Sequence, residues 1–449
     1  MSKIDLGKDK ILPTLLKLAL PSMIGQIVNM LYNLIDRIYV GNIQNGTQAL
    51  AGLGVCFPIT LILSSFASLV GLGGTPLSSI KLGENKKDEA NKIFNQSFIF
   101  LIIIGFLLTI ITFIFAKDIL SLFGCPSDSL DYGTSYLKIY CIGTIFTLLT
   151  LGLNPFINAQ GYALTSMFTT LIGASLNIIL DPIFIYNLNL GINGAALATI
   201  ISQMVSCIYV VTFFLKKKSL FKYQKKYFLL DKTLLSILFL GLSPFIMQIT
   251  ESAIQIVFSI CLNKTTNGNS DYTACMTILL SALQFISYPL NGFSNGAQPL
   301  ISFNYGAKNK QRLTIAIKYI AIFSFIYTSI FYSISMIYPK LYGYIFSSTE
   351  QVQTLIEQYG RIFLMGTIMF FAQMSLQNVF VALNQAKISI FLACLRKVIL
   401  LIPLCIILSS IIGAKGVFLS EGIADITAGI ITFTTFCLYA PKVIKKKCD

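Results

Sequence analysis

Apolar stretches of about 20 residues recur along the whole chain, and each is long enough to cross the hydrocarbon core of a bilayer as a helix. We count twelve of them in the 449 residues. They run near residues 13–37, 50–72, 96–116, 136–157, 164–187, 194–215, 233–262, 273–301, 315–338, 359–382, 388–411 and 416–440. The sequence therefore predicts an all-α polytopic membrane protein with twelve transmembrane helices.

The composition supports a membrane protein and excludes several other classes. Charged residues make up 11% of the chain and hydrophobic residues 55%, whereas soluble proteins average about 25% charged residues. An ordinary cytosolic enzyme is therefore excluded. Disorder requires low hydrophobicity, and a disulfide-stapled secreted module would be much shorter.

The chain has no histidine, which excludes a Ser-His-Asp triad, a Cys-His pair, an HExxH zinc site and a His-ligated haem. Its ten cysteines form no CxxC pair and lie mostly in apolar stretches, where a free cysteine behaves as a small hydrophobe. We therefore expect no catalytic residues, no cofactor and no enzymatic activity.

The net charge of +15 is explained by where the cations lie. With the N-terminus inside, 24 Lys and Arg residues fall in inner segments, 6 in outer segments and 3 in or at the ends of spans. Positive charge collects on the cytoplasmic side of membrane proteins, so both termini are predicted to be cytoplasmic. We expect the basic residues to contact anionic lipid headgroups rather than nucleic acid.

Four separated patches of the sequence repeat at nearly one offset, which indicates an internal repeat. "PLSSIKLGENKK" from Pro76 matches "PLISFNYGAKNK" from Pro299 at an offset of 223 residues. The other pairs begin at Pro21 and Pro244, at Tyr136 and Tyr359 (both offset 223), and at Gly191 and Gly413 (offset 222).

Each copy holds six spans, an even number, so both copies enter the membrane from the same side. They are therefore parallel repeats, related by an axis along the membrane normal. We predict an N-lobe over 1–215, a cytoplasmic linker over 216–232 and a C-lobe over 233–449, with a V-shaped central cleft. Two lobes around a cleft are a transporter architecture.

Five acids lie within the predicted spans, where a charge costs roughly 2.5–3.5 kcal/mol at the bilayer centre. They are Asp36, Asp181, Glu251, Glu421 and Asp425. Because no span clearly offers a Lys or Arg to all five, we expect most of them to be protonated, ion-bound or wet. For Glu421 and Asp425 an interfacial position without a function remains an alternative.

Polar residues form stripes at helical spacing on several spans. The stripes comprise Gln26/Asn29/Asn33/Asp36, Gly173/Asn177/Asp181, Gln248/Glu251/Gln255, Ser281/Gln284/Tyr288/Asn291, Ser64/Ser68 and Gln373/Gln377. Such stripes can simply join helices, and for the Ser and Gln pairs this reading stays open. Stripes that carry a carboxylate are expected to line water.

The topology places Asp36 and Asp181 at similar depth, toward the outer ends of two spans. Two carboxylates at one depth can share a proton or hold a small cation. Pro21 lies in the same span as Asp36, and Pro182 follows Asp181. Because proline lacks an N–H donor and loosens a helix, we expect helix kinks there that switch with the site.

Several segments, in their order and spacing, resemble the multidrug and toxic compound extrusion family and its MepA-like bacterial branch. They are "LPSMIGQIVNMLYNLIDRIYVGNI", "NIILDPIFIY", "NGAALATIIS" and "GAQPLISFNYGAKN". The resemblance covers essentially the whole chain. It implies secondary active export of cationic, amphipathic drugs, driven by Na⁺ or H⁺.

The resemblance also implies a cation site in the N-lobe. The residues that match it are Asp36, Asn154, Asn177, Asp181 and Thr199, all of the expected type. Some relatives also use an acid on the seventh span, for which Glu251 is a match, and one on the tenth. The tenth span here has no acid between Gly360 and Val381, so we do not expect a C-lobe site built on it.

We hypothesise alternating access, in which a cation at Asp36 and Asp181 lowers the affinity for a drug held between the lobes. Aromatic faces attract organic cations and methionine adapts to many shapes, with ordinary helix packing as the alternative reading. The candidate substrate-binding residues are Glu251, Gln26, Asn29, Tyr288, Met369 and Gln373. The sequence does not distinguish Na⁺ from H⁺, which use the same carboxylates.

A lipid-linked precursor flippase of the same superfamily is the main rival. Its pyrophosphate cargo would need a cationic lining, yet only Arg37, Arg396 and Lys397 lie in or beside spans, against five acids. Cationic cargo is therefore favoured. Lys outnumbers Arg 29 to 4, which suggests an AT-rich bacterial genome, and we expect a monomer in the cell membrane.

Overall fold

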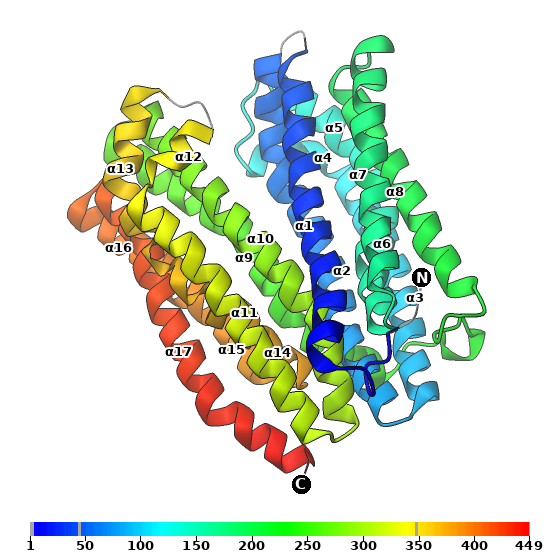
Figure 1. Ribbon diagram of the computed structural model, residues 1–449. Helices are drawn as coiled ribbons and strands as arrows, with labels where there is room; N and C mark the ends of the chain where they lie inside the picture. The colour runs from blue at the N-terminus through cyan, green and yellow to red at the C-terminus, as the bar shows by residue number, and fades with distance from the viewer. Residues whose placement is uncertain (1–3, 44–45, 346–348, 449) are drawn as a thin grey trace.

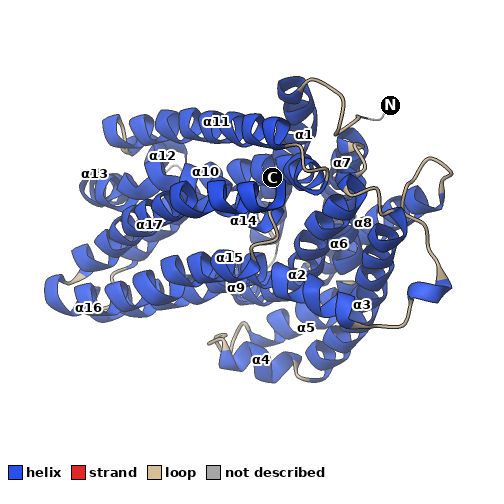
Figure 2. Ribbon diagram, turned by 90° about the horizontal axis from the view of Figure 1, so that it is seen from below, coloured by secondary structure: helices blue, strands red, loops and turns tan. Residues whose placement is uncertain are grey.

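A computed structural model describes residues 4–43, 46–345 and 349–448, and within these ranges the chain is helical and contains no β-strand (Figure 2). The first half contains α1 (Ile11–Gly41), α2 (Gly46–Gly83), α3 (Lys87–Ile114), α4 (Ala116–Leu122), α5 (Leu130–Ile142), α6 (Thr144–Ala159), α7 (Ala163–Pro182), the π-helical η1 (Ile183–Asn187) and α8 (Ile192–Leu215). The prediction of an all-α protein is confirmed.

The second half follows a short 3₁₀ turn, η2 (Lys225–Tyr227). It contains α9 (Lys232–Thr266), α10 (Ser270–Gly306), α11 (Lys310–Ile337), α12 (Lys340–Ile345), α13 (Glu350–Leu364), η3 (Met365–Met369), η4 (Phe371–Leu376), α14 (Gln377–Ala382), α15 (Ala386–Cys394), η5 (Leu395–Leu401), α16 (Ile402–Ile412) and α17 (Ala414–Cys448). Of these, η4 and η5 are π-helical and η3 is a 3₁₀ helix.

Eleven helical segments of the described chain are long and apolar enough to span a membrane, and α5 with α6 forms a twelfth that bends by 55°. The prediction of twelve spans is confirmed. The bend lies inside the predicted span 136–157 and was not predicted. The bend lies at Gly143, where an added Cβ would lie 2.6 Å from Ile200 of α8. Glycine weakens the helix there and lets α8 approach closely.

Several helices are longer than the predicted spans. For example, α2 has 38 residues and α10 has 37. At about 1.5 Å per residue such helices exceed the roughly 30 Å hydrocarbon core. Their polar ends continue the helix beyond the apolar stretch, which is the only part that hydropathy detects.

Figure 1 shows two bundles, α1–α8 and α9–α17, which meet at the lower end of the view and diverge at the upper end. We call them the N-lobe and the C-lobe. The main contacts between them are α1 with α10, and α2 with both α9 and α10. The beginning of α1, the end of α17 and the segment between α8 and α9 lie toward the lower end (Figure 1).

The contact between α2 and α10 is reciprocal, as an internal twofold requires. An added Cβ on Gly83 would collide with the carbonyl of Phe303, and one on Gly306 would collide with the carbonyl of Ile80. Gly306 and Phe303 stand 223 residues after Gly83 and Ile80. Equivalent residues that exchange places across a contact indicate a twofold relation, which confirms the parallel repeat.

The ends of the repeats also match in backbone conformation. Gly191 precedes α8 with φ 55° and ψ −133°, and Gly413 precedes α17 with φ 64° and ψ −145°. Both backbones are in a region that only glycine enters readily. The register of 222 residues between α8 and α17 is therefore fixed by geometry as well as by sequence.

The segment between α8 and α9 is held against α3. The side chains of Asn91, Asn95 and Gln96 bond the backbone of residues 222–229 at 2.7–3.1 Å. Asp231 accepts from Thr233 N–H and so caps α9. The Lys92 ammonium, with the amide of Gln96 and the N–H of Thr233, holds the pKa of Asp231 well below its usual range.

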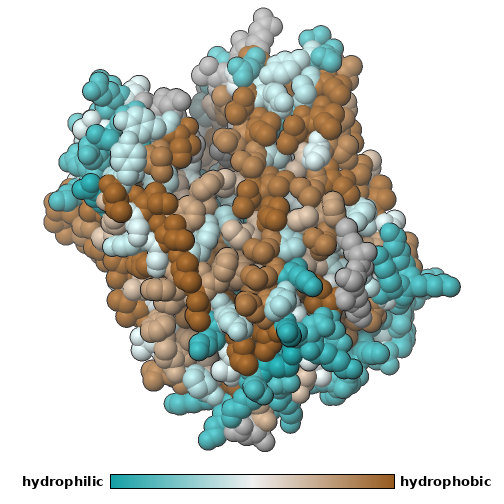
Figure 3. Space-filling view, in the orientation of Figure 1, coloured by the Kyte–Doolittle hydropathy of each residue, from teal (hydrophilic) through white to brown (hydrophobic). Residues whose placement is uncertain are grey.

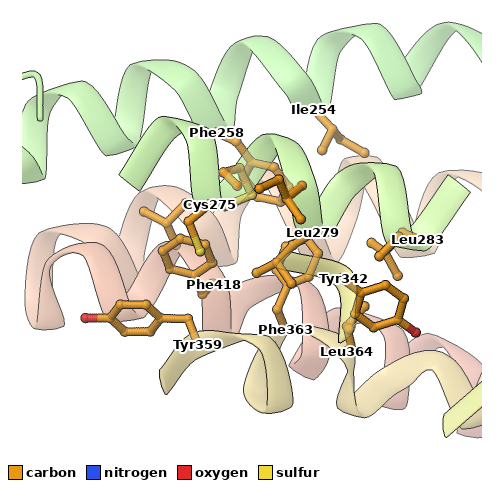
Figure 4. Close-up of a cluster of buried hydrophobic side chains, with 14 of the residues drawn as sticks. Ile254, Phe258, Cys275, Leu279, Leu283, Tyr342, Tyr359, Phe363, Leu364 and Phe418 are labelled. Atoms are coloured by element: carbon orange, nitrogen blue, oxygen red, sulfur yellow. The ribbon is translucent and has the colours of Figure 1, made fainter. Parts of the chain in front are cut away.

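Each lobe has its own apolar core. In the C-lobe, side chains from α9, α10, α13 and α17 pack together, and the rings of Tyr359 and Phe418 stack with centroids 4.6 Å apart (Figure 4). In the N-lobe, Phe94 stacks on Phe221 at 5.4 Å, so the segment after α8 is part of that core.

The surface of both lobes is largely apolar around the middle and hydrophilic at the lower end (Figure 3). Large apolar side chains such as Phe106, Ile326 and Ile411 are more than half exposed. An apolar belt of this kind is what a hydrocarbon solvent selects, whereas soluble monomers rarely expose such large patches. A hollow separates the two lobes at the upper end of this view.

The glycine contact between the lobes makes a prediction. Replacing Gly83 by Ala places a methyl group against the backbone of α10, and overpacking of this kind costs about 1–3 kcal/mol. The purified protein in detergent should therefore melt at a lower temperature than the wild type. Gly54→Ala, also in α2 but with open space around its Cβ position, is the matched control, and equal melting temperatures for the two variants would refute the close contact.

Candidate functional site

Three of the five predicted cation ligands form one hydrogen-bonded group in the N-lobe. Asn177 Nδ2 donates to Asp181 Oδ1 at 3.1 Å and to Thr199 Oγ1 at 3.4 Å. Asn177 and Asp181 lie one turn apart on the same face of α7, and Thr199 is on α8. Asp36 of α1 is buried and within electrostatic range of Asp181.

Two oxygens of this group accept no hydrogen bond from the described residues. They are Asp181 Oδ2 and Asn177 Oδ1, in side chains that are 0% and 2% exposed. A buried acceptor without a donor is unfavourable. A proton or a small monovalent cation would satisfy both oxygens, so the donor set fits either coupling ion.

The structure places Asn154 away from the other four residues. Its Oδ1 accepts from Thr169 Oγ1 at 2.8 Å, and its Nδ2 donates to the carbonyl of Ser166 at 3.1 Å. Thr169 precedes Asn177 by eight residues, about 12 Å along α7. The Asn154 amide therefore joins α6 to α7 and does not reach the Asp181 group.

The two prolines behave differently. α1 continues through Pro21 as a single helix. Pro182 ends α7, and the chain continues directly into the π-helical η1. Because π-helical turns are frequent at functional sites, the change of helix type beside Asp181 agrees with a special role, while the predicted switching of kinks stays a prediction.

The polar stripe on α1 faces the other lobe at its lower part. An added Cβ on Gly292 of α10 would lie 2.8 Å from Gln26 Cγ, so Gln26 lies at the contact between α1 and α10. Asn29 is partly exposed one turn further on. The side chains of Asn33 and Arg37 lie outside the described residues.

Two predicted substrate residues are packed inside the C-lobe. Met369 lies against Gly429 of α17. Gln373 is 2% exposed, and its amide donates to the carbonyl of Asp425. Tyr288 of α10 is partly exposed. In this conformation Met369 and Gln373 therefore support the fold of the C-lobe.

The serine stripe of α2 joins the two lobes. Ser68 Oγ donates to Gln248 Oε1 at 2.7 Å, and Gln248 Nε2 donates to Ser64 Oγ at 3.1 Å. Gln377 bonds Ser243 and Ser389 within the C-lobe. For these residues the reading as helix-joining stripes is confirmed.

The C-lobe contains a set of five ionisable residues, four of them buried, that we call the C-lobe charge network. Arg396 Nε lies 2.6 Å from Asp425 Oδ1, and Arg396 Nη2 lies 3.2 Å from Glu421 Oε1. Lys397 Nζ pairs with Glu251 Oε1 and lies 3.3 Å from the carbonyl of Met247. The Glu251 side chain is 46% exposed, whereas that of Lys397 is 3% exposed.

Several uncharged groups shape the network. The Arg396 guanidinium lies 5.1 Å from the centre of the Phe370 ring, a cation–π arrangement. An added Cβ on Gly366 would collide with Asp425, so glycine is what lets α17 approach η3. Arg396 and Lys397 themselves stand on the π-helical η5.

The network corrects two expectations. Glu251, Glu421 and Asp425 do have cationic partners, and neither Glu421 nor Asp425 is interfacial, since both are buried. As expected, the C-lobe acids do not come from the tenth span, which contributes Gln373 instead. The adjacent pair Arg396–Lys397 within an apolar stretch of the sequence could have predicted this network, because cations inside a membrane require acidic partners.

The same pairing weakens the flippase alternative. Arg396 and Lys397 are two of the three cations that could have lined a pyrophosphate site, and both are bound to carboxylates. A charge already paired with an acid offers little to an anionic cargo.

Comparison with known proteins agrees with the duplicated helical fold. The MatE family model matches residues 21–183 and 243–407, once in each lobe. The chain belongs to the MatE family. As a member of this family it is a multi-pass membrane transporter.

Relatives of this MatE protein include two bacterial proteins named "Multidrug export protein MepA". That of Staphylococcus haemolyticus (strain JCSC1435) is 25% identical over 434 residues, 96% of this chain and 94% of the relative. That of Staphylococcus aureus (strain NCTC 8325 / PS 47) is 26% identical over 431 residues, 93% and 92% of the two chains. A solved structure described as the outward-facing conformation of a multidrug resistance MATE family transporter of the MOP superfamily has a TM-score of 0.90, 22% identity and 99% coverage of both chains.

The charge network makes a prediction about stability. Replacing Arg396 by Met leaves Glu421 and Asp425 buried without a cation, which costs about 3–5 kcal/mol. The melting temperature of the purified protein should fall strongly and should recover when Glu421→Gln and Asp425→Asn are added.

Lys340→Met is the matched control for that measurement, because it removes a cation from an ion pair of 2.7 Å whose two side chains are partly exposed. Exposed pairs contribute little to stability, so its melting temperature should stay near that of the wild type. An Arg396→Met variant as stable as Lys340→Met would contradict the burial of the network.

Proposed function

We propose that this MatE family member is a secondary multidrug exporter that exchanges amphipathic organic cations for Na⁺ or H⁺ by alternating access. The observation that carries the proposal is the buried carboxylate pair Asp36 and Asp181. Asp36 stands on α1 and Asp181 on α7, and the two lie within electrostatic range of each other. Asp181 Oδ2 and the neighbouring Asn177 Oδ1 accept no hydrogen bond from the described residues. The names of the relatives, multidrug export proteins, support the drug as the exchanged partner.

The distribution of charge supports an orientation with both termini in the cytoplasm. The lysine-rich segment 216–232, the beginning of α1 and the end of α17 lie toward the end where the lobes meet (Figure 1). By the positive-inside rule this end faces the cytoplasm. The lobes diverge at the opposite end, so the conformation is open to the outside.

Polar contacts close the cytoplasmic end. Lys447 Nζ lies 2.7 Å from Glu84 Oε1, and Asn158 Nδ2 donates to the carbonyl of Gly296 at 3.0 Å. Burial raises the pKa of Glu84, but the ammonium groups of Lys447 and Lys81 outweigh it, and the net pKa lies below the usual range. The ion pair with Lys447 therefore holds across the neutral pH range and would break when the lobes separate there.

α1 is the element that links the ion site to the cleft. It carries Asp36, packs against α7, and also packs along α10 of the other lobe. Its backbone lies so close to Gly292 and Gly296 of α10 that an added Cβ would lie 2.8–2.9 Å from α1 backbone atoms. A cation that changes the shape of α1 therefore changes the contact between the lobes, and coupling requires this kind of differential contact.

The drug site belongs between the lobes. Glu251 is a half-exposed carboxylate on α9, and its neighbour Ser252 bonds the carbonyl of Pro58 on α2 at 3.4 Å. The rings of Phe66 and Phe245 meet edge to face across the same pair of helices at 5.0 Å. Glu251 pairs with Lys397, but its network holds three carboxylates and two cations, and the remaining negative charge together with nearby aromatic rings attracts an organic cation.

The ion site predicts loss of export on charge removal. Asp36→Asn and Asp181→Asn should each cut ethidium efflux by about 10- to 100-fold, the range of typical coupling energies, because neither amide carries the charge that holds the ion. Efflux is measured in cells or proteoliposomes. Asp118→Asn, which replaces an exposed acid of α4, is the control. Full efflux in both Asp36→Asn and Asp181→Asn would refute the proposal.

The coupling ion follows from imposed gradients. In proteoliposomes, a Na⁺ gradient or a pH gradient alone should drive ethidium transport, and the effective gradient identifies the ion, because a coupled exchanger moves drug only against its own ion. Transport that responds to neither gradient would contradict cation-coupled exchange.

A further inference from the structure

The C-lobe charge network has one more carboxylate than cations. Glu251, Glu421 and Asp425 face Arg396 and Lys397, so the network carries a net charge of −1 when all five are ionised. Four of the five residues are at most 8% exposed. An uncompensated charge at such a position is strongly unfavourable, and one additional positive charge would balance it.

Three buried oxygens mark where that charge belongs. Glu421 Oε2, Asp425 Oδ2 and Gln373 Oε1 accept no hydrogen bond from the described residues. Glu421 and Asp425 are one turn apart on α17, and each uses its other oxygen to bind Arg396. The Gln373 amide bonds the backbone of Asp425, so all three residues belong to one site.

The position also has a counterpart in the N-lobe. The register of 222 residues that is fixed by Gly191 and Gly413 places Glu421 at the position of Thr199, and Asp425 at that of Gln203. Thr199 belongs to the hydrogen-bonded group around Asp181. Glu421 therefore occupies, in the C-lobe, the place that a predicted ion ligand has in the N-lobe.

The chemistry of the site favours a proton. Within the described residues no group of three acids or cysteines could hold a metal ion. A metal ion would also be repelled by the Arg396 guanidinium.

We propose that Glu421 is a second proton-binding residue of the transporter, with Oε2 as the atom that takes up the proton. An O–H bond forms at Oε2 while an O–H bond of a hydronium ion breaks and leaves water, and the network charge rises from −1 to 0. Glu421 is the acceptor because its contact with Arg396 is 3.2 Å, whereas that of Asp425 is 2.6 Å. The inference rests on the proposed antiport function, to which it adds a C-lobe proton site.

The network extends from this buried acid to the cleft. Glu421 and Asp425 bind Arg396, and the adjacent Lys397 pairs with Glu251, while the Cys405 thiol of α16 lies within electrostatic range of Glu421. Glu251 at the other end is half exposed. An organic cation beside Glu251 and a proton on Glu421 would each add one positive charge to the same network, so each disfavours the other. That mutual exclusion is what an exchange of drug for proton requires.

Infrared spectroscopy of the full-length protein in lipid bilayers tests the site, because a protonated carboxyl has its own C=O band. The N-lobe carboxyls are first removed by Asp36→Asn and Asp181→Asn. In this background one carboxylic-acid band should persist and should disappear as the pH rises. Adding Glu421→Gln should abolish it, and adding Asp425→Asn should also abolish it, because the network is then neutral without a proton. Glu357→Gln, an exposed acid of α13, should leave the band unchanged.

The proposal is overturned if the background variant has no such band, if the band survives both C-lobe substitutions, or if Na⁺ at constant pH removes it. Either C-lobe variant alone suffices if the other does not fold. Ethidium export by the wild type is measured separately. Export without the band rejects only the C-lobe proton site, and the band without export rejects only the exporter function.

Discussion

An ionised side chain inside a membrane has little water to stabilise it, and the arrangement of this protein follows from how each lobe meets that constraint. In the C-lobe, Arg396 and Lys397 bind three acids. In the N-lobe, Asp181 is bonded by the neutral Asn177 amide, and its second oxygen accepts no bond from the described residues. The C-lobe therefore largely supplies its own counter-charge, whereas in the N-lobe we propose that an ion from outside has that role.

The internal repeat makes this difference instructive. Gly191 and Gly413 start equivalent helices in the same backbone conformation, and yet Thr199 on the first helix is replaced by Glu421 on the second. The two copies of the repeat keep the same helix packing because small residues and helix lengths determine that packing. The charged residues are set by what each lobe must bind, so they diverge while the fold stays.

The fold was more predictable than the sites, for physical reasons. Hydropathy gives the number of spans, and the constant offset between matching segments reveals the repeat. Hydropathy does not detect a bend such as that at Gly143 or the polar ends of helices. The same holds for Asn154, whose residue type fits a ligand although its amide is used by Thr169 and Ser166. The partners of Glu421 and Asp425 depend on which faces of α16 and α17 meet, and on the π-helical η5, which no spacing rule predicts.

In the proposed alternating access the lobes move against each other without exposing these charges, and the contacts between them suit that requirement. Both buried charged groups lie within single lobes and can move with them as units. The interface consists of close glycine contacts such as Gly83 with α10, neutral hydrogen bonds such as Ser68 with Gln248, and an ion pair at the rim, Glu84 with Lys447. Partly exposed ion pairs and neutral hydrogen bonds contribute little net free energy, because water replaces them when they open. Separation of the lobes at the end where they meet therefore leaves the buried networks intact, and in the proposed exchange the free energy that selects one state over the other comes from the bound ion and drug.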